Sequence, residues 1–493
     1  MIAGSFFWVG LSSALSRSLT MLATLILAAF LSPDAFGVVT IANLITAALG
    51  LFRDFGMNQA IIYQKKDIGR AADTAMVLSV SVSLLLFAIG YLLAEPAAVF
   101  FRNPAVEDVI KILPFSLVIT AFSTIPSSLL EKEMDFKRRA LPEILSFLTY
   151  FIVSVTLARL GLSYWSIIFG YLALCIVGLV ATFAVSPWHP TFRFHPSVLK
   201  ELIGFGSYAM LSTITGFVIR NVDSFSVGRL LGTTPLGFYD LAYRLGNVTT
   251  TQITHVVGKI TFPAYVKMSH DARMMKSAYL KAYRWLSLIT FPVAIGIIVF
   301  VPSFFHIFYG DKWDAAIVPS QIIAIYGLSR GLFSHAGGVF MSSGKIHEIF
   351  WITFGQLAVL AAAVWPVVIH FGLIGMTLLL AVLNLLTVIA VAVRVEKILP
   401  DTITRYLGLS FFPLIVSLAA IVVPVLVWTH LVGDLTFWPF IGLIVFCGLL
   451  YAAVILTRNP ELLAEIRGWI SELRSHGGTT EILPGDDDPI KRG

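Results

Sequence analysis

The segment VIRNVDSFSVGRLLGTTPLGFYDLAYRLGN, residues 218–247, decides how the chain folds. It lies in a region apolar enough for a lipid bilayer, yet it carries five charges. These are Arg220, Asp223, Arg229, Asp240 and Arg244. A charged side chain that faces lipid costs about 2.5–3.5 kcal/mol on insertion scales. The segment therefore predicts two membrane-embedded helices, joined by a tight loop, whose charged faces line an interior cavity.

The composition places the rest of the chain in a membrane as well. Of 493 residues, 57% are hydrophobic and 13% are charged, and the mean hydropathy is +0.87. A soluble domain of this length could not keep so much apolar surface away from water. Cys175 and Cys447 both lie in apolar runs, which argues against a disulfide framework or a cysteine metal site. The first apolar segment lacks the features of a cleaved signal peptide and is expected to remain as the first span.

Apolar windows long enough to cross the hydrocarbon core recur from end to end of the chain. We predict an all-α polytopic membrane protein with about fourteen transmembrane helices. In the gaps between them, 24 Lys and Arg residues lie on the even-numbered side, counting the tail, against four on the odd-numbered side. The positive-inside rule then places both termini in the cytoplasm. The net charge of +6 reflects this bias, so no nucleic-acid partner is expected.

An internal repeat divides the chain. Leu27–Ile45 aligns with Val227–Leu245 without a gap at an offset of 200 residues, and both are read as helix, tight outer loop, helix. Two duplicated lobes suit a transporter with its substrate site between the repeats, although two apolar hairpins can also look alike by chance. The expected division is a six-helix lobe at 1–190, a second at 191–400, two additional transmembrane helices at 401–458, and a cytoplasmic tail at 459–493 with a short interfacial helix and a disordered end.

Polar residues recur at helical spacing on four of the predicted spans. The first two stripes contain Ser13, Ser16, Arg17, Thr20 and Thr24, and then Asn43, Thr46, Gly50, Arg53 and Asp54. The other two contain Ser212, Thr213, Gly216, Arg220 and Asp223, and then Asp240, Arg244, Asn247, Thr251 and His255. Each helix would turn one face to lipid or neighbours and the other to water and substrate. Four such helices are what the walls of a wet cavity require.

Positive charge is in excess within the predicted spans. The arginines are Arg17, Arg53, Arg220, Arg229, Arg244 and Arg330, and the aspartates are Asp54, Asp223 and Asp240. The aspartates could form structural pairs, Asp223 with Arg220 and Asp240 with Arg244, or take part in ion coupling. Three arginines would still lack a partner, and a low-dielectric cavity with such a surplus favours an anionic ligand. The planar guanidinium fork suits phosphate oxygens.

Five segments of the chain resemble the polysaccharide-transporter (Wzx-type) branch of the MOP flippase superfamily. They are AAFLSPDAFGVVTIANLI (28–45), DFGMNQAII (54–62), LLEKEMDFKRR (129–139), RNVDSFSVGRLLGTTPLGFYDLAYRL (220–245) and YGDKWDAA (309–316). The resemblance covers most of residues 1–400. It implies two six-helix lobes facing each other in a V, with two extra C-terminal helices. It also implies alternating-access export of an undecaprenyl-diphosphate-linked oligosaccharide across the bacterial inner membrane, for exopolysaccharide, capsule or O-antigen synthesis.

The resemblance also indicates which residues bind the substrate. In related lipid flippases, arginines on the first, second and eighth helices line the central cavity, and Arg17, Arg53 and Arg244 stand in comparable places. With Arg220 and Arg330 they are the expected diphosphate contacts. The expected sugar contacts are Asn43, Asn247, Tyr239 and Tyr243. The expected partners are this substrate, membrane lipids and the polysaccharide polymerase machinery, and we expect no cofactor, metal or catalytic residue.

Other functions fit the sequence less well. A multidrug and toxin antiporter of the same superfamily, which is the chief alternative, would favour an acidic cavity for cationic drugs. A membrane glycosyltransferase or ligase would need a substantial periplasmic loop with catalytic carboxylates, and the outer loops are short. A non-transporting scaffold would not require polar stripes on four helices. The segment Gly338–Lys345 is one residue too long for a Walker A loop, so an ion gradient or consumption of the product outside is expected to drive transport.

Overall fold

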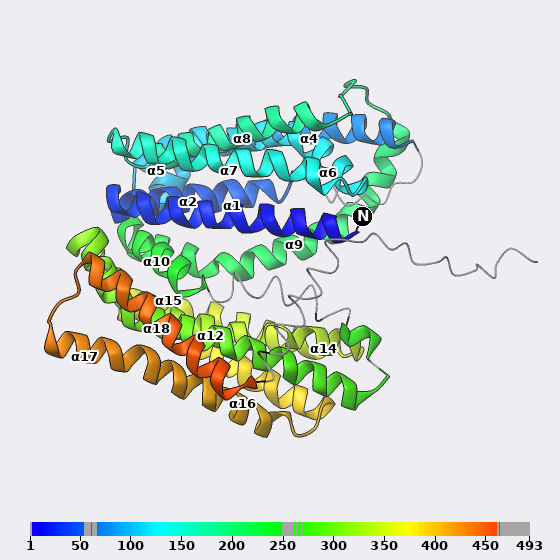
Figure 1. Ribbon diagram of the computed structural model, residues 1–493. Coiled ribbons are helices and arrows are strands. Elements are labelled where there is room, and N and C mark those ends of the chain that lie inside the picture. The colour runs from blue at the N-terminus through cyan, green and yellow to red at the C-terminus, as the bar shows by residue number, and fades with distance from the viewer. Residues whose placement is uncertain are drawn as a thin grey trace, which may run out of the picture.

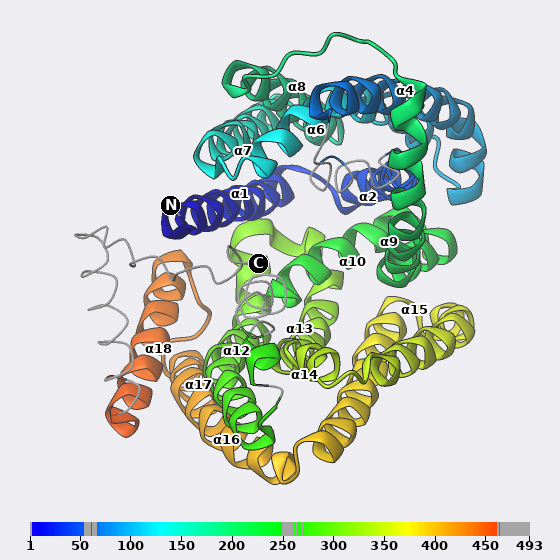
Figure 2. The same cartoon turned by 90° about the vertical axis from the view of Figure 1, so that its right-hand side faces the viewer.

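The structure, a computed structural model, describes residues 2–53, 61, 67–248, 261, 264–268, 270–460 and 463, and every regular element in these ranges is a helix. Two bundles of helices lie one above the other, with two helices between them (Figures 1 and 2). The first bundle consists of α1 (Ile2–Phe30), α2 (Pro33–Gly50), α4 (Ile68–Phe101), α5 (Ala105–Ile112), α6 (Phe115–Lys132), α7 (Phe136–Arg159) and α8 (Trp165–Val185).

The second bundle consists of α12 (Ala272–Tyr309), η1 (Gly310–Ala316), α13 (Ile317–Phe333), α14 (Ala336–Ser342), α15 (Ile346–Ile398), α16 (Thr402–Ser417), η2 (Leu418–Val422), α17 (Val423–Leu431) and α18 (Phe437–Arg458). The intervening helices are α9 (Pro196–Leu231) and α10 (Thr233–Gly246). The α10 helix contacts α2 on one side and α13 on the other, while α9 contacts α4 and α15. These two helices therefore connect the bundles.

Ten helical stretches within the described residues are long and apolar enough to cross a membrane. This confirms the predicted all-helical, multi-pass fold, while the count of about fourteen spans stays a prediction. Several of the ten stretches are not one continuous α-helix. The α15 helix turns at Gly372, whose φ is 59°, η1 interrupts the stretch Ala272–Ser342, and residues 113–114 separate α5 from α6 within Ala105–Lys132. The charged helices α9 and α10 are not among the ten. The interfacial helix predicted in the tail falls almost entirely outside the described residues.

The two copies of the predicted repeat pack against each other through their glycines. A Cβ atom on Gly37 of α2 would stand 1.8 Å from the carbonyl oxygen of Thr233, and one on Gly237 of α10 would stand 1.8 Å from that of Pro33. The contacts are reciprocal at the offset of 200 residues that relates the two repeats. Only glycine permits backbones to approach this closely. The glycine contact thus holds α2 and α10 together around a local two-fold relationship.

Hydrogen bonds beside the glycine contact join the same two helices. Ser32 caps α2, its hydroxyl accepting from the Ala35 amide at 3.3 Å, and Asp34 lies in the first turn, where a negative charge is favoured. The Thr233 hydroxyl donates to the Asp34 carboxylate. Asn103 Nδ2 donates to Thr233 Oγ1 at 2.9 Å. The start of α2, the turn after α4 and the start of α10 therefore form one hydrogen-bonded unit.

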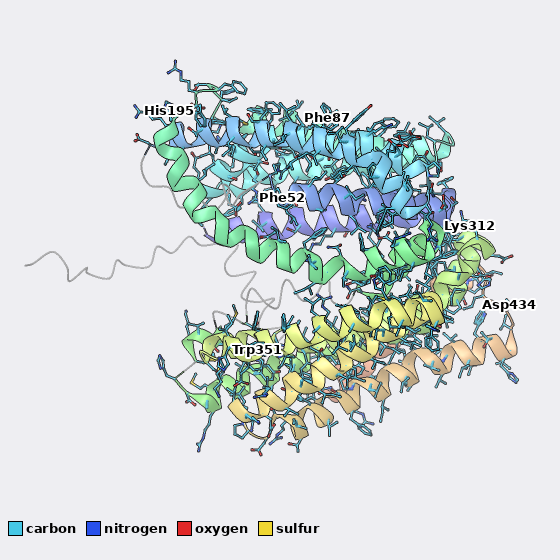
Figure 3. All side chains as sticks on the ribbon, turned by 180° about the vertical axis from the view of Figure 1, so that it is seen from behind. Phe52, Phe87, His195, Lys312, Trp351 and Asp434 are labelled. Atoms are coloured by element: carbon cyan, nitrogen blue, oxygen red, sulfur yellow. The ribbon has the colours of Figure 1, made fainter. Side chains whose placement is uncertain are left out.

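The short helix η1 attaches the second bundle to α1 at the same place. Trp313 is fully buried, its Nε1 donates to the Ala28 carbonyl at 2.9 Å, and its ring packs edge-on against Phe36 and Phe238. Lys312 Nζ donates to the Ala29 carbonyl at 2.6 Å. Figure 3 shows Lys312 at one end of the helices and His195 at the other. We call the end that holds the Gly37–Thr233, Asp34–Thr233 and Trp313–Ala28 contacts the closed end.

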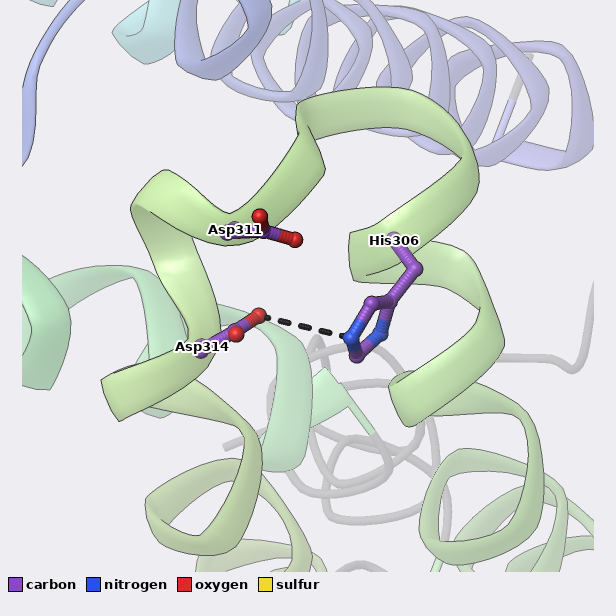
Figure 4. A group of neighbouring side chains, drawn as sticks. All are labelled: His306, Asp311 and Asp314. Carbon is purple, nitrogen blue, oxygen red and sulfur yellow. Dashed lines mark ion pairs between the residues drawn. The ribbon is translucent and has the colours of Figure 1, made fainter.

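An exposed group of titratable side chains also belongs to η1. Asp311 and Asp314 point toward His306 in the last turn of α12, and His306 Nε2 lies 3.7 Å from Asp314 Oδ1 (Figure 4). All three side chains are exposed. An ion pair in water at this distance contributes little to stability. The buried contacts of Trp313, rather than this group, therefore fix η1 to the first bundle.

The Trp313→Phe variant is expected to lower the free energy of unfolding by about 1 kcal/mol, because phenylalanine keeps most of the packing but cannot donate to the Ala28 carbonyl. Denaturant or thermal unfolding of the purified protein in detergent measures the change. The matched control is Trp438→Phe, since the Trp438 side chain is 79% exposed and its loss should be silent. Equal stabilities of the two variants would contradict the role assigned to the Trp313 hydrogen bond.

Candidate functional site

Two adjoining hollows lie between the helices of the first bundle and α10. One has a volume of about 540 Å³ and the other of about 710 Å³. They share the lining residues Thr20, Thr24, Phe147, Asp240 and Arg244. Helices α1, α2, α6, α7 and α8 provide most of the wall, and α10 closes it. We call the two hollows together the polar cavity.

Three arginines from three helices line the polar cavity. Arg17 of α1 lines the larger hollow, Arg53 just after α2 lines the smaller, and Arg244 of α10 lines both. Arg53 Nη1 donates to the Thr120 hydroxyl of α6 at 2.6 Å, which fixes the direction of its guanidinium. Arg244 Nε lies 2.7 Å from Asp240 Oδ2, one helical turn away. The structural pair considered for Asp240 therefore forms, and both of its members still face the cavity.

A second carboxylate faces the cavity and was not anticipated. Glu143 of α7 lines the larger hollow, and Ser16 Oγ donates to its Oε1 at 3.3 Å. Three arginines therefore face two carboxylates, Asp240 and Glu143, in the polar cavity. The positive surplus among these described side chains is one, smaller than the predicted three. The sequence did contain a signal for this residue, because Glu143 is the lone carboxylate within the span expected near residue 150.

Threonine hydroxyls of the cavity are oriented by their own helices. The hydroxyls of Thr20, Thr24, Thr40 and Thr120 each donate to the carbonyl four residues earlier, at 2.7–2.9 Å. The Thr120 oxygen already accepts from Arg53, and the oxygens of Thr20, Thr24 and Thr40 can each accept from a donor elsewhere. The buried Thr46 Oγ1, also in the lining, has no hydrogen-bond partner among the described groups. The cavity thus offers guanidinium donors together with hydroxyl acceptors.

The predicted sugar contacts are divided by the fold. Asn43 lines the smaller hollow, and Tyr243 and Asn247 line the larger. Tyr239 lines neither, because its side chain is buried and its hydroxyl donates to Asp223 Oδ2 at 2.6 Å. Asp223 also accepts from the Ser224 amide. Three of the four residues therefore face the polar cavity, and Tyr239 instead holds Asp223.

The remaining predicted charges lie elsewhere. Arg220 folds back over Gly216, where a Cβ atom would be 3.3 Å from its Nη1, and within the described part of the chain it forms no ion pair with Asp223, contrary to the structural pair considered above. Arg330 Nη1 donates to the Tyr326 hydroxyl at 2.7 Å. Neither arginine lines either hollow. Asp54 lies outside the described residues.

The location of the cavity also differs from the expectation of a site between two lobes. Its walls belong mainly to the first bundle. Among the described residues after 190, those that line it belong to α10 and to the two positions just after Gly246, which are Asn247 and Val248. The physical reason is the glycine contact, which holds α10 directly against α2. Tyr150 and Tyr171, on α7 and α8, complete the smaller hollow. Neither carries a charge or belongs to a polar stripe, so neither was anticipated.

An apolar groove adjoins the polar cavity. It has a volume of about 560 Å³ and is lined by α12, η2 and α18 together with Leu25 of α1 and Leu245 of α10. These two leucines are the sequence neighbours of Thr24 and Arg244, which line the polar cavity. Helices α1 and α10 therefore separate a polar space from an apolar one, each presenting a different face to the two sides.

Comparison with known proteins decides the family. Residues 26–318, more than half of the chain, match the family described as "Polysaccharide biosynthesis protein". The chain belongs to this family. The resemblance seen in the sequence is thereby confirmed. The polar cavity lies in the matched region except for its α1 residues between 13 and 24.

Relatives of this polysaccharide biosynthesis protein match along most of its length. It is 24% identical to the lipopolysaccharide biosynthesis protein WzxC of Escherichia coli (strain K12), over 87% of this chain and 88% of the relative. It is 22% identical to the succinoglycan biosynthesis transport protein ExoT of Rhizobium meliloti (strain 1021), over 83% of each.

A solved structure shares the fold. The lipid II flippase MurJ, in an inward closed conformation, superposes with a TM-score of 0.66 and 15% identity, covering 92% of this chain and 99% of MurJ. At this identity the likeness concerns the fold alone. The arrangement of two helical bundles joined at one end is thus the fold of a known membrane transporter.

Proposed function

We propose that this polysaccharide biosynthesis protein is a flippase for a lipid-linked oligosaccharide, moving it from the cytoplasmic to the periplasmic leaflet for exopolysaccharide, capsule or O-antigen synthesis. The observation that best supports this function is the polar cavity, which has Arg17, Arg53 and Arg244 in its wall and lies beside an apolar groove. A lipid-linked oligosaccharide has the same three parts: an anionic diphosphate, a polar saccharide and an apolar tail. The names of the relatives WzxC and ExoT support the same process.

In this proposal each part of the substrate has its own place. The diphosphate lies among Arg17, Arg53 and Arg244, because charge-assisted bonds from guanidinium forks are the strongest that the cavity offers. Saccharide hydroxyls donate to the threonine oxygens and bond to Asn43, Tyr243 and Asn247. The prenyl tail lies in the apolar groove on the far side of Leu25 and Leu245. Arg220 and Arg330 line neither hollow and have no part in this placement of the substrate.

Transport requires the closed end to open. In the arrangement described, the Gly37, Asp34 and Trp313 contacts join the bundles at one end. Binding of a diphosphate would neutralise the excess positive charge of the polar cavity and so change the relative stability of the two open states. We infer that Asp223, held by Tyr239, is structural in this state. Export by such rocking needs no catalytic residue, so we propose a transporter rather than an enzyme.

The proposed location is the bacterial inner membrane, with both termini in the cytoplasm. The support is the bias of 24 Lys and Arg residues to one side against four on the other. The closed end, which contains the turns at residues 31–32 and 232, then faces the periplasm. The proposed partners are the lipid-linked substrate, membrane lipids and a polymerase that consumes the exported units.

A multidrug cation antiporter remains the second candidate because Asp240 and Glu143 face the polar cavity. A cationic drug would need at least one carboxylate that is not already engaged. Asp240 holds Arg244 at 2.7 Å, and Glu143 accepts from Ser16. With three arginines in the same wall, the field in the cavity favours an anion. Cation export is therefore the weaker proposal.

Leaflet-resolved measurement of lipid-linked intermediates tests the proposed function. In a strain that lacks the protein, undecaprenyl-diphosphate-linked oligosaccharide is expected to accumulate in the inner leaflet, inaccessible to a periplasmic glycosidase. Expression of the wild-type chain should return the intermediate to the outer leaflet and restore polymer. Accumulation in the outer leaflet would instead indicate a polymer-joining role, and unchanged intermediates with altered drug sensitivity would indicate cation export.

A further inference from the structure

A basic pocket lies far from the polar cavity, between α12 and α16. It has a volume of about 520 Å³. Its lining residues are Arg273, Lys276, Ser277, Leu280, Lys281, Arg284, Trp285, Arg405 and Leu409. Five of these nine described residues are cations, and none of the nine is a carboxylate. Nothing in the proposed transport of an oligosaccharide uses this pocket.

The two helices present their cations to the same space. The α12 residues Arg273, Lys276, Leu280 and Arg284 follow one another at steps of three or four, so they share one helix face. Arg405 contributes from α16, which packs against α12. Below the pocket the helices are tied by a Tyr283–Ser410 hydrogen bond of 2.8 Å. The positive charges are therefore held close together by the packing of the two helices.

Some of these cations have polar partners within the protein, and Arg284 Nη2 donates to Asn459 Oδ1 at 3.0 Å. Asp401 lies 3.4 Å from Lys276 Nζ, with a side chain 82% exposed. Glu396 is engaged at the start of α16, where it accepts from the amides of Asp401, Thr402 and Ile403 at 2.6–2.9 Å. Among the described carboxylates none lies within ion-pair distance of Arg273 or Arg405. Like charges crowded in one pocket repel, and an anion placed between them removes the repulsion.

The apolar part of the lining indicates that the anion belongs to an amphiphile. Leu280, Trp285 and Leu409 stand among the cations. The α12 helix has 38 residues, about 57 Å at 1.5 Å per residue, against a hydrocarbon core of about 30 Å. Its first turns therefore extend beyond the core at the end opposite to η1, where the headgroups of one leaflet lie. Tryptophan favours this depth of a membrane.

We propose that this pocket binds the phosphodiester headgroup of an anionic membrane phospholipid, with the first carbons of the acyl chains against Leu280, Trp285 and Leu409. Basic pockets between transmembrane helices on the cytoplasmic side are suited to such headgroups. The bound lipid bridges α12 to α16 and so holds these two helices of the second bundle together. The site is separate from the polar cavity. The proposal therefore does not depend on which substrate the protein transports.

Lipid titration of the purified full-length chain tests the site. Phosphatidylglycerol is added to the protein in phosphatidylcholine nanodiscs, and retained lipid is counted by native mass spectrometry while the unfolding temperature is recorded. Wild type should retain phosphatidylglycerol and unfold at a higher temperature with it. Each of Arg273→Gln and Arg405→Gln should weaken retention about fivefold, and the double variant about 25-fold, from about 1 kcal/mol per basic residue.

Several arms of the experiment separate this site from general charge attraction. Arg193→Gln, an exposed arginine of the linker before α9, is the control and should change retention less than twofold. The charge-conserving Arg273→Lys/Arg405→Lys variant should retain most of the lipid. In phosphatidylcholine alone, Arg273→Gln/Arg405→Gln should unfold at a higher temperature than wild type, because it relieves repulsion.

The following outcomes would overturn the proposal. The first is that Arg273→Gln/Arg405→Gln retains as much phosphatidylglycerol as wild type. The second is that Arg193→Gln lowers retention as much as Arg273→Gln or Arg405→Gln does. Inorganic phosphate that raises the unfolding temperature as much as phosphatidylglycerol would show a site for a soluble anion instead. None of these outcomes depends on the cargo, so the proposed flippase function can fail while this site stands, and the reverse.

Discussion

Gly237→Ala is expected to reduce polymer export by about 5- to 150-fold, because overpacking costs about 1–3 kcal/mol and about 1.4 kcal/mol is a factor of ten. The added Cβ would stand 1.8 Å from the Pro33 carbonyl oxygen, a backbone atom that cannot rotate away. The α10 helix must then separate from α2. The Asp34–Thr233 bond and the packing of Trp313 against Phe238 would be lost with it, and the closed end could no longer form.

Export is measured as surface polymer per unit of membrane-inserted protein, with thermal unfolding of the purified chain alongside. Gly37→Ala should reproduce the loss, since its Cβ would meet the Thr233 carbonyl at the same 1.8 Å. Gly442→Ala is the matched control: it lies within α18 and a Cβ there has nothing within 4 Å. Alanine is favoured over glycine inside a helix, so this control should be neutral or slightly stabilising. Normal export and stability of Gly237→Ala would show that the glycine contact is not tight.

Arg244→Ala is expected to weaken binding of the diphosphate by about 10- to 150-fold, the equivalent of about 1.5–3 kcal/mol for a hydrogen bond to a charged group. It should be the most damaging of the single arginine changes in the polar cavity. In the wild-type chain Asp240 Oδ2 lies 2.7 Å from Arg244 Nε. Removal of Arg244 leaves Asp240 as an unpaired negative charge that faces the incoming diphosphate. Export by complemented cells and binding by purified protein measure the two consequences.

A double variant separates the lost bond from the exposed carboxylate. Asp240→Asn/Arg244→Ala should recover part of the binding lost in Arg244→Ala, because asparagine does not repel the diphosphate. The control is Arg394→Ala, an arginine of α15 outside the polar cavity that faces Glu348 at 3.7 Å. Equal binding by Arg244→Ala and Arg394→Ala would remove Arg244 from the substrate site. A double variant no better than Arg244→Ala would show that Asp240 does not meet the substrate.

Much of the fold could be predicted because a bilayer permits few solutions. Apolar windows identify membrane helices, and the offset of 200 residues that aligns Leu27–Ile45 with Val227–Leu245 also relates the Gly37 and Gly237 contacts. The stripe Ser13, Ser16, Arg17, Thr20 and Thr24 lines the polar cavity throughout. Periodicity could indicate this face because it is a property of one helix and needs no knowledge of its neighbours.

Choices between neighbours could not be predicted. Asp223 has Arg220 three residues away in sequence, yet it bonds to Tyr239 of the following helix, because the packing of α9 on α10 brings that hydroxyl closer than a flexible arginine. Arg330 is held by Tyr326 on its own helix. Glu143 enters the cavity only because α7 packs against α1. Helical periodicity gives the face of a residue, whereas tertiary packing decides which group covers it.

The affinity of the purified protein for a prenyl-diphosphate-linked saccharide tests the central claim most directly. It is compared between wild type and Arg17→Ala/Arg53→Ala/Arg244→Ala, with the uncharged prenol of the same chain length as the reference ligand. We predict that the triple variant loses more than about a hundredfold in affinity for the diphosphate lipid, from three charge-assisted bonds, and binds the prenol as wild type does. Equal affinity of both proteins for the diphosphate lipid would contradict the account.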